Sequence, residues 1–503
     1  MSEEPRHTVG YPVRRRSTAV ASIVNTFELL ITALILAFVF RAFVAEAFRI
    51  PTGSMAETLR GSHYNLRCIR CGHPFAIGGD RDSWSRPQPR CPSCAHILPS
   101  GMGVSVSNGD RILVLKCMYQ FLPPQRWDVL VFKNPVDPRE NYIKRLIASP
   151  GETLEIVEGD IYIDGRIARK PPKVQEALWM PVYNNDYQSI RHGRVLPGGG
   201  GTDELTIWRQ PFEKEPNSLW NLNAKGPTVF AIQGRTGRLH WLKYNDQVAS
   251  DFRASYAYNN GAEHDVQPIC SDLMIRFDVT NVDGEGVIGA SLSANGIEFR
   301  AAVDLTGTMM LGKMDSGGLV ELARMQMDAV KPGSDRRFQF ANVDRQLVFS
   351  FGDKTLRHDL GSARVDVDAF SRGTPPSVAI FGDGALTLWH IALFRDVHYV
   401  DGHDVGERIA RAAEGSPFTL GPDEYFVCGD NSPSSLDSRL WATEGIGNGG
   451  RRYAAGVVPK DYLMGKAFFV YWSDAFRPSE NLWPIVPNIG GLKLIHGGSD
   501  KVF

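Results

Sequence analysis

Two residues of this 503-residue chain have the types and settings of a catalytic pair. Ser54 lies in the run Pro51-Thr52-Gly53-Ser54, where proline favours a turn and glycine keeps side-chain bulk low around the hydroxyl. A serine on such a turn is a candidate nucleophile, although most serines beside glycine are plain turn residues. The nucleophile needs a base, and none of the 12 histidines stands in a recognisable catalytic setting beside an aspartate.

The alternative base is a lysine whose pKa is lowered by burial. Lys144 lies in the apolar, strand-like run Tyr142–Ile147, which the turn Ser149–Glu152 closes. If this side chain points inward from the strand, desolvation disfavours its charged form, and a neutral lysine can then accept the proton of a serine. An outward, solvated lysine is the competing interpretation of this stretch taken alone.

Four cysteines form a second constellation with chemical meaning. Cys68 and Cys71 make one CxxC pair, Cys91 and Cys94 make another, and 19 residues separate the pairs. This spacing predicts a zinc ribbon with four thiolate ligands, and Gly72 provides the tight turn that such a knuckle requires. Four thiolates leave no open coordination position, so the predicted role is structural. Two disulfides are the alternative, although a CxxC disulfide is strained and usually redox-active.

A membrane-spanning helix is predicted just before Ser54. The segment Val20–Phe40 contains 21 residues, and its only charge is Glu28. At a rise of about 1.5 Å per residue, about 20 helical residues cross a hydrocarbon core of about 30 Å. A buried core helix is the competing interpretation.

The residues on either side of this segment indicate its orientation in the membrane and whether it is cleaved. Arg6 and the run Arg14–Arg16 precede it and favour a cytoplasmic N-terminus, although Arg41 also follows it. The pattern Ala45–Ala47 would suit a cleavable signal peptide. We expect a permanent anchor instead, because the candidate nucleophile follows directly. The bulk of the chain would then lie on the outer face of the membrane.

Composition limits the remaining possibilities. Lys plus Arg total 55 and Asp plus Glu total 56, so bulk charge gives no reason to expect a nucleic-acid partner. The modest mean hydropathy excludes a transporter with many spans. The 50 glycines and 31 prolines indicate many turns and therefore a mainly β fold.

Apolar and polar residues alternate along several segments. One such region surrounds the predicted hairpin turn Glu158–Asp160. Further on, Leu273–Val279, Ile297–Leu305 and Leu347–Phe351 repeat the pattern, which resembles jelly-roll sandwiches of the concanavalin or laminin-G type. Such folds often bind glycans or proteins, but fold analogy does not establish a ligand. Five aromatic residues could line a carbohydrate surface, although core positions are the commoner explanation: Trp179, Tyr183, Trp208, Trp220 and Trp241.

Four stretches resemble, in order, the conserved boxes of bacterial type I signal peptidases. They are FRIPTGSMAETL at 48–59, GDRILVLK at 109–116, YIKRLIASPGE at 142–152 and GDNSPSSLDSRLW at 429–441. They follow an N-terminal apolar segment, as they do in that family. One such match could arise by chance, whereas four in order are highly specific.

The resemblance implies a serine–lysine dyad. Ser54 would be the nucleophile and Lys144 its general base. The Ser54 N–H and the hydroxyl of Thr52, where many members carry serine, would hold the oxyanion. Catalysis would need no cofactor.

The fourth box implies the supporting residues. Ser435 would hydrogen-bond and orient the lysine, and Asp437 with Arg439 would form a salt-bridged pair behind the site. Many members carry arginine after GDN, whereas this chain has Ser432-Pro433, so the contacts of that arginine are in question.

The resemblance therefore implies a signal peptidase I. It would remove signal peptides from exported preproteins after small residues, at the lipid surface of a bacterial cytoplasmic (inner) membrane. The alternative is a tethered module that binds glycan or protein on an inactive peptidase scaffold. A third hypothesis has the sandwich dock particular substrates, so that its deletion narrows the substrate range without abolishing cleavage of a short peptide.

The sequence divides into six predicted units. These are a cytoplasmic tail (1–19), a transmembrane helix (20–41), a catalytic domain in three pieces (42–66, 97–174 and 406–479), a zinc ribbon (67–96), a β-sandwich (175–405) and a C-terminal tail (480–503).

Overall fold

The structure, a computed structural model, describes residues 19–79, 89–99, 106–188, 208–259, 261–364, 374–400, 411–473 and 489–498. Several expectations concern residues outside these ranges. They include the N-terminal arginines, almost all of the predicted cytoplasmic tail, the boundary at 405 and most of the C-terminal tail.

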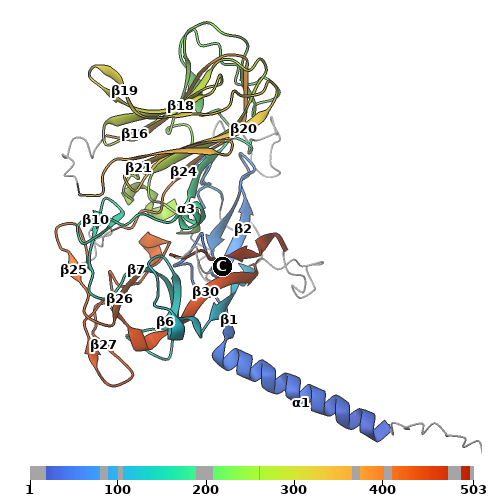
Figure 1. Cartoon of the computed structure of the whole chain (residues 1–503), viewed down its shortest axis with the longest axis vertical. Coiled ribbons are helices and arrows are strands. Elements are labelled where there is room, and N and C mark those ends of the chain that lie inside the picture. Colours follow the sequence, from blue (N-terminus) through green and yellow to red (C-terminus); the bar gives the residue numbers. More distant parts are fainter. Residues whose placement is uncertain are drawn as a thin grey trace, which may run out of the picture.

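An antiparallel eight-stranded sheet forms the lower part of the molecule in Figure 1. Its order is β1 (Ala45–Arg49), β5 (Arg111–Leu115), β30 (Leu463–Trp472), β6 (Val129–Lys133), β7 (Asn141–Ala148), β26 (Glu424–Cys428) and β29 (Val458–Pro459), with β31 (Lys493–Leu494) beside β30. Alternating apolar side chains of β5 and β6, such as Ile112 and Val131, fill one core of this sheet. The last long strand, β30, therefore lies between two strands from the first third of the chain.

Two small sheets extend this region. One contains β10 (Arg166–Ile167), β9 (Asp160–Ile163), β8 (Thr153–Val157) and β25 (Phe418–Thr419), and the other β27 (Gly445–Ile446) and β28 (Arg452–Tyr453). The predicted hairpin turn is confirmed between β8 and β9. Glu158 and Gly159 have φ values of 52° and 87°, as a two-residue turn with left-handed backbone requires.

A sandwich of two seven-stranded sheets forms the upper part. One sheet contains β11 (Met180–Asn184), β24 (Leu386–Arg395), β15 (Leu273–Asn281), β20 (Asp335–Val343), β21 (Gln346–Phe351) and β22 (Lys354–Asp359), with β13 (Phe230–Ile232) beside β24. The other contains β12 (Phe212–Lys214), β14 (His240–Tyr244), β23 (Ser377–Asp383), β16 (Val287–Ala294), β17 (Ile297–Asp304), β18 (Thr308–Asp315) and β19 (Gly318–Gln326).

The predicted alternation is confirmed in the core of this sandwich. Side chains that point inward from Leu273–Val279 and Leu347–Phe351 are buried there. Tyr183 and Trp220 lie in the same core, whereas Trp208 packs on the cysteine region. The mainly β fold with an inserted sandwich is therefore confirmed.

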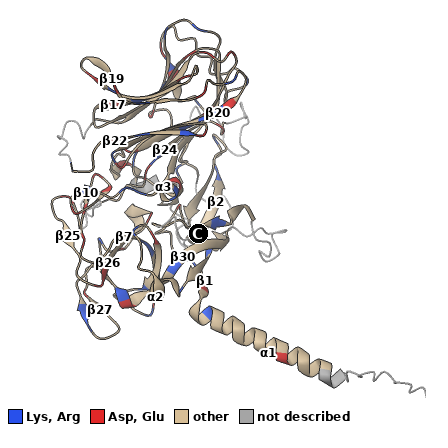
Figure 2. Cartoon of the chain, in the orientation of Figure 1, with Lys and Arg blue, Asp and Glu red and all other residues tan. Residues whose placement is uncertain are grey.

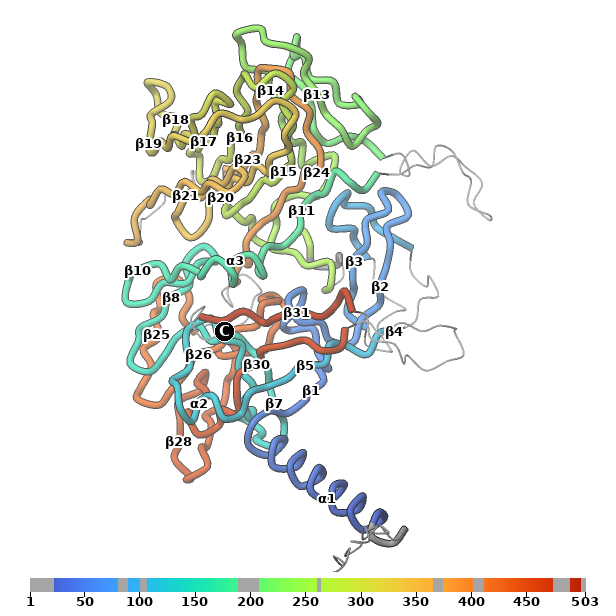
Figure 3. The backbone as a smooth tube through the Cα atoms, turned by 45° about the vertical axis from the view of Figure 1, so that its right-hand side comes forward, coloured from blue at the N-terminus to red at the C-terminus, as the bar shows by residue number. Residues whose placement is uncertain are grey.

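The cysteine region forms a third part beside the other two (Figure 3). Its strands are β2 (His63–Arg67), β3 (Pro74–Gly78) and β4 (Val106–Ser107). The helices are α1 (Ala19–Phe43), α2 (Met118–Phe121) and α3 (Pro172–Leu178), with short 3₁₀ turns η2 (Ala257–Asn259), η3 (Gly261–Val266), η4 (Ser432–Ser434), η5 (Lys460–Tyr462) and η6 (Ile489–Gly491).

Helix α1 projects away from the body of the molecule (Figures 1 and 2). Among the described residues, one stretch, Ser22–Phe43, forms a helix long and apolar enough to cross a membrane. The described side chains of α1 are exposed along nearly its whole length, and Figure 2 shows few charges on it. Its length and apolar surface agree with the predicted span.

Candidate active site

Ser54 and Lys144 meet in the structure, although 90 residues separate them in the sequence. Ser54 lies on the turn that follows β1, and Lys144 lies in the middle of β7. The Lys144 Nζ atom donates a hydrogen bond of 2.5 Å to the Ser54 Oγ atom. The two residues are only 8% and 5% exposed, so this contact is shielded from water.

The surroundings of Lys144 favour its neutral form. Burial lowers the pKa of Lys144 to about 8, while the negative charge of Asp437 acts in the opposite direction. Burial dominates because a desolvated ammonium loses its hydration. A substantial fraction of Lys144 is therefore neutral near pH 8, as a proton acceptor for Ser54 must be.

Ser435, Asp437 and Arg439 form a buried polar group behind the pair. The Ser435 hydroxyl donates a hydrogen bond of 2.7 Å to Asp437, and two guanidinium nitrogens of Arg439 donate bonds of 2.7 and 2.8 Å to the same carboxylate. Although burial raises the pKa of Asp437, Arg439 and these hydrogen bonds hold it below its usual value. In this structure Ser435 therefore binds the ion pair, and its predicted contact with Lys144 stays a prediction.

Thr52 lies two residues before Ser54 on the same turn, with its side chain exposed. The Thr52 backbone packs against Gly61, where a Cβ atom would come within 2.4 Å of the Thr52 carbonyl. The turn is therefore held in place through its backbone. The role of the Thr52 hydroxyl stays a prediction.

The chain's departure from the family pattern at Ser432 has a structural counterpart. Ser432 is buried, and its hydroxyl oxygen accepts hydrogen bonds of 2.5 Å from Arg439 and 2.8 Å from the Val400 N–H. Arg439 also donates a bond of 2.6 Å to the Val400 carbonyl. Because the side chain at this position is small, Arg439 can bind Val400, which lies in the segment that connects the sandwich to the last part of the peptidase domain.

Asn431 contacts the catalytic turn, although no sequence expectation named this residue. Its backbone N–H donates to the Ser54 carbonyl at 3.1 Å, and its side-chain amide donates to the Gly53 carbonyl at 3.0 Å. Asn431 lies in the fourth motif, and this position is the sequence feature that could have indicated its contact with the catalytic turn. Residues 256–259 also contact the loops around the site, and these residues belong to no sequence motif that could have indicated it.

The four predicted metal ligands also come together. Their sulfur atoms all lie within 4.8 Å of one another, and the Sγ atoms of Cys68 and Cys94, and of Cys71 and Cys91, are 3.6 Å apart. Tetrahedral zinc with bonds of about 2.3 Å places its sulfurs about 3.8 Å apart, whereas a disulfide needs about 2.05 Å. The four cysteines therefore fit a single metal ion.

Known proteins match the part of the chain that carries this site. The family model "Signal peptidase, peptidase S26" matches residues 93–199 and 393–472. The matched segments include Lys144, Ser435, Asp437 and Arg439, while Ser54 precedes them. They form a peptidase domain, and hence a hydrolase domain.

Individual relatives agree with the family model. A probable signal peptidase I-1 of Synechocystis is 29% identical over 196 residues, which is 37% of this chain and 74% of that protein. Signal peptidase I of Pseudomonas aeruginosa is 30% identical over 27% of this chain and 35% of its own length. The matched part of the chain is thus similar to S26 signal peptidases, which confirms the resemblance, and three of the four motifs lie within the family-model match.

Solved structures match at low scores. A carbohydrate-binding module from Bacillus subtilis has a TM-score of 0.22 and 12% identity over 37% of this chain and 92% of that one. No ligand of the sandwich is inferred from this likeness.

Proposed function

We propose that the protein is a membrane-anchored serine endopeptidase that removes signal peptides from exported preproteins by cutting after small residues. One observation carries the proposal: the 2.5 Å hydrogen bond between Lys144 and Ser54 inside a buried site. The similarity to signal peptidases supports the substrate class.

The reaction follows from this geometry. Neutral Lys144 accepts the Ser54 proton as the Oγ atom attacks the scissile carbonyl, and the Lys144 ammonium then donates a proton to the leaving amine. The Ser54 N–H and the Thr52 hydroxyl would stabilise the oxyanion. Lys144 next takes a proton from the water molecule that attacks the acyl-enzyme, and returns a proton to the Ser54 Oγ atom as the ester bond breaks. The Asp437 carboxylate favours the ammonium formed in each cycle.

The proposed location follows from α1. Ten residues, 44–53, connect this helix to Ser54, and five of them form β1. In a bacterial inner membrane, with the N-terminus cytoplasmic, α1 would hold the site at the outer lipid surface. Signal peptides present their cleavage sites just beyond their own apolar segments.

We further propose a structural zinc ion at Cys68, Cys71, Cys91 and Cys94. Four neutral thiols that are buried together stabilise one another little, whereas a metal cation bound between four thiolates neutralises their charge. Metal analysis of the purified protein should give one zinc per chain, and Cys91→Ser should lose it. If the protein contains no zinc and the four cysteines do not react with a thiol reagent, disulfides are indicated instead.

The catalytic proposal is tested with a model preprotein. Detergent-solubilised wild type, Ser54→Ala and Lys144→Ala are compared side by side at equal concentration. The wild type should cut at the small-residue site and both variants should be inactive. An inert wild type would refute the proposal, and an active Lys144→Ala variant would require another base.

A further inference from the structure

The sandwich reaches into the candidate active site through one short segment. We call residues 252–259, between β14 and β15, the tip. The Tyr256 hydroxyl donates a hydrogen bond of 2.8 Å to the Asp430 carbonyl, and the Tyr258 hydroxyl donates one of 2.9 Å to the Ser62 carbonyl. The tip thus contacts loops on both sides of the Ser54 turn.

We propose that Asn259 and Tyr258 are positioning residues for Ser54, so that the inserted sandwich completes the active site. This inference rests on the proposed peptidase function. Neither residue contacts the Ser54 hydroxyl in the described hydrogen bonds, so both would act through the backbone that carries the nucleophile.

Asn259 acts through Asn431. The two side-chain amides exchange hydrogen bonds of 2.6 and 2.7 Å, and the Asn431 amide also donates to the Gly53 carbonyl. That carbonyl belongs to the same peptide unit as the Ser54 N–H. Because a peptide unit is planar, fixing the carbonyl also fixes the direction of the N–H. Asn259 therefore helps to orient the proposed oxyanion donor.

Tyr258 acts through packing. A Cβ atom at Gly53 would lie 2.1 Å from the Tyr258 ring, and one at Gly78 of β3 would lie 2.8 Å from it. The ring thus rests on the backbone of the catalytic turn and on the cysteine region together. The absence of side chains at both glycines makes this close approach possible.

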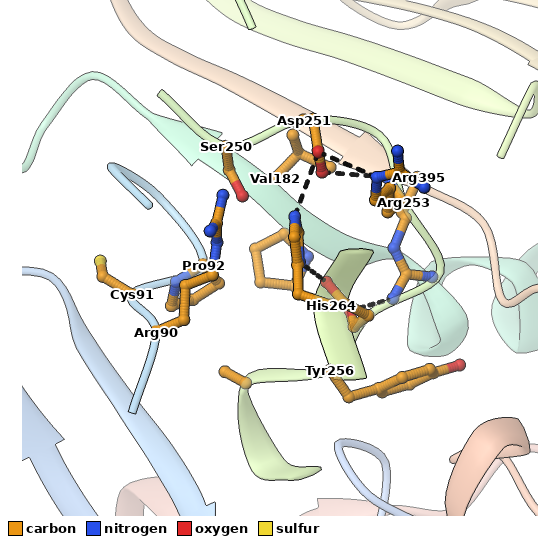
Figure 4. A pocket seen from close by; sticks show the side chains of 13 residues that line it. Arg90, Cys91, Pro92, Val182, Ser250, Asp251, Arg253, Tyr256, His264 and Arg395 are labelled. Carbon is orange, nitrogen blue, oxygen red and sulfur yellow. Dashed lines mark hydrogen bonds and ion pairs between the residues drawn. The ribbon is translucent and has the colours of Figure 1, made fainter. Parts of the chain in front are cut away.

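Hydrogen bonds from other parts of the sandwich fix the conformation of the tip (Figure 4). His264 is bonded through Nδ1 to the Ser255 hydroxyl at 2.7 Å and through Nε2 to Asp251 at 3.1 Å. Arg395 donates a bond of 2.6 Å to the Ser255 carbonyl and lies over the Tyr256 ring. These contacts preform the tip before any substrate binds.

The same residues do not form a second hydrolytic site. Ser255, His264 and Asp251 have the composition of a catalytic triad. The cavity that they line, however, holds only about 30 Å³, close to the space of a single water molecule. Without room for a substrate, the His264 contacts serve to brace the tip.

The test compares Asn259→Ala with wild type in preprotein cleavage. An oxyanion donor contributes about 10²–10³ in rate, and misorientation should forfeit part of it. We expect kcat to fall at least about tenfold with KM changed by less than about threefold. Asn259→Asp keeps an acceptor for the Asn431 amide and should recover part of kcat.

A second readout is independent of turnover. Hydrogen exchange of the backbone amides at 52–56 should be faster in Asn259→Ala than in wild type. Asn245→Ala is the matched control, because Asn245 belongs to the same insertion but bonds Glu213 instead of the catalytic loops. Tyr258→Phe keeps the ring and loses the bond to Ser62, so its loss of kcat should be smaller than that of Tyr258→Ala.

The outcomes separate the two proposals. An unchanged kcat in Asn259→Ala, or a loss no larger than in Asn245→Ala, would overturn the positioning role. If the wild type itself is inert, the peptidase function fails. The exchange experiment then still decides whether Asn259 holds the Ser54 turn.

Discussion

Among the contacts between the sandwich and the peptidase domain in the described residues, two differ clearly in chemistry. At the tip, the contacts are made by neutral amides, phenol groups and backbone carbonyls. At the second place, which we call the acidic junction, Lys170 bonds Asp344 at 2.6 Å and Asp396 at 2.7 Å. Asp160 and Asp272 lie close by, so four carboxylates share one lysine.

We therefore expect the tip to affect the orientation of Ser54 and the acidic junction to affect the stability with which the sandwich is attached. The groups that join the tip to the catalytic loops do not ionise near neutral pH, so these hydrogen bonds do not depend directly on pH. Buried charges are costly to desolvate and depend on their protonation. The acidic junction should therefore control how firmly the sandwich is attached, without affecting the direction of the nucleophile.

The largest expected effect comes from Lys170→Met. It removes the cation and leaves the buried Asp344 and Asp396 without their positively charged partner, which costs about 3–5 kcal/mol in comparable sites. Denaturant unfolding should show this loss, while kcat of the remaining folded protein should stay near the wild-type value. The exposed Lys214→Met on β12 is the control. A large fall in kcat at full folding would show that the two contacts are not separable.

The next effect is the pH dependence of cleavage. Because the pKa of Lys144 is lowered to about 8, mainly by burial, kcat/KM should rise about tenfold per pH unit below that value and level off above it. A pH series at preprotein concentrations well below KM measures this. A second ionisation in the same profile that disappears in Asp272→Asn would contradict the separation of the two contacts.

The last prediction concerns the pH dependence of the free energy of unfolding. Burial and the charge of Asp344 raise the pKa of Asp272 to about 8, and burial also raises the pKa of Asp160. The folded state therefore binds protons more tightly than the unfolded chain, where an aspartate has a pKa of about 3.9. Between these values the contribution of Asp272 to stability falls as pH rises.

Asp272→Asn tests this prediction. Asparagine cannot ionise, and its side-chain oxygen can still accept the Asp344 N–H bond that Asp272 accepts at 2.6 Å. The unfolding midpoint of the variant should decline less than that of wild type between pH 5 and 9. Equal slopes would mean that Asp272 does not titrate in this range.

Sequence analysis predicted the parts of the site that lie in compact motifs. The apolar run around Lys144 left an inward and an outward side chain possible, and the resemblance of its motif to the family indicated the base; the structure places Lys144 against Ser54. The cysteine pairs were recognisable from spacing alone. Their functional roles and the division of the chain into units stay predictions.

The two contacts with the sandwich could not be predicted in this way. Asn259 and Asn431 are 172 residues apart, and Asn259 lies in a segment without motif or periodicity. The junction aspartates occupy separate turns and strand ends, where aspartate is common for local reasons. Their meeting depends on how the sandwich docks, which local patterns do not encode.

The position of β30 in the large sheet has a consequence for the order of folding. This strand, almost the last of the chain, pairs with β5 on one side and β6 on the other. During synthesis from the N-terminus, β5 can pair with β1 and β6 with β7, but each lacks its second neighbouring strand until the whole sandwich has been made. Contacts between such distant segments form slowly. The nascent peptidase thus stays incomplete until its final strand arrives, and a chain that stops before Leu463 has a gap in the middle of its catalytic sheet.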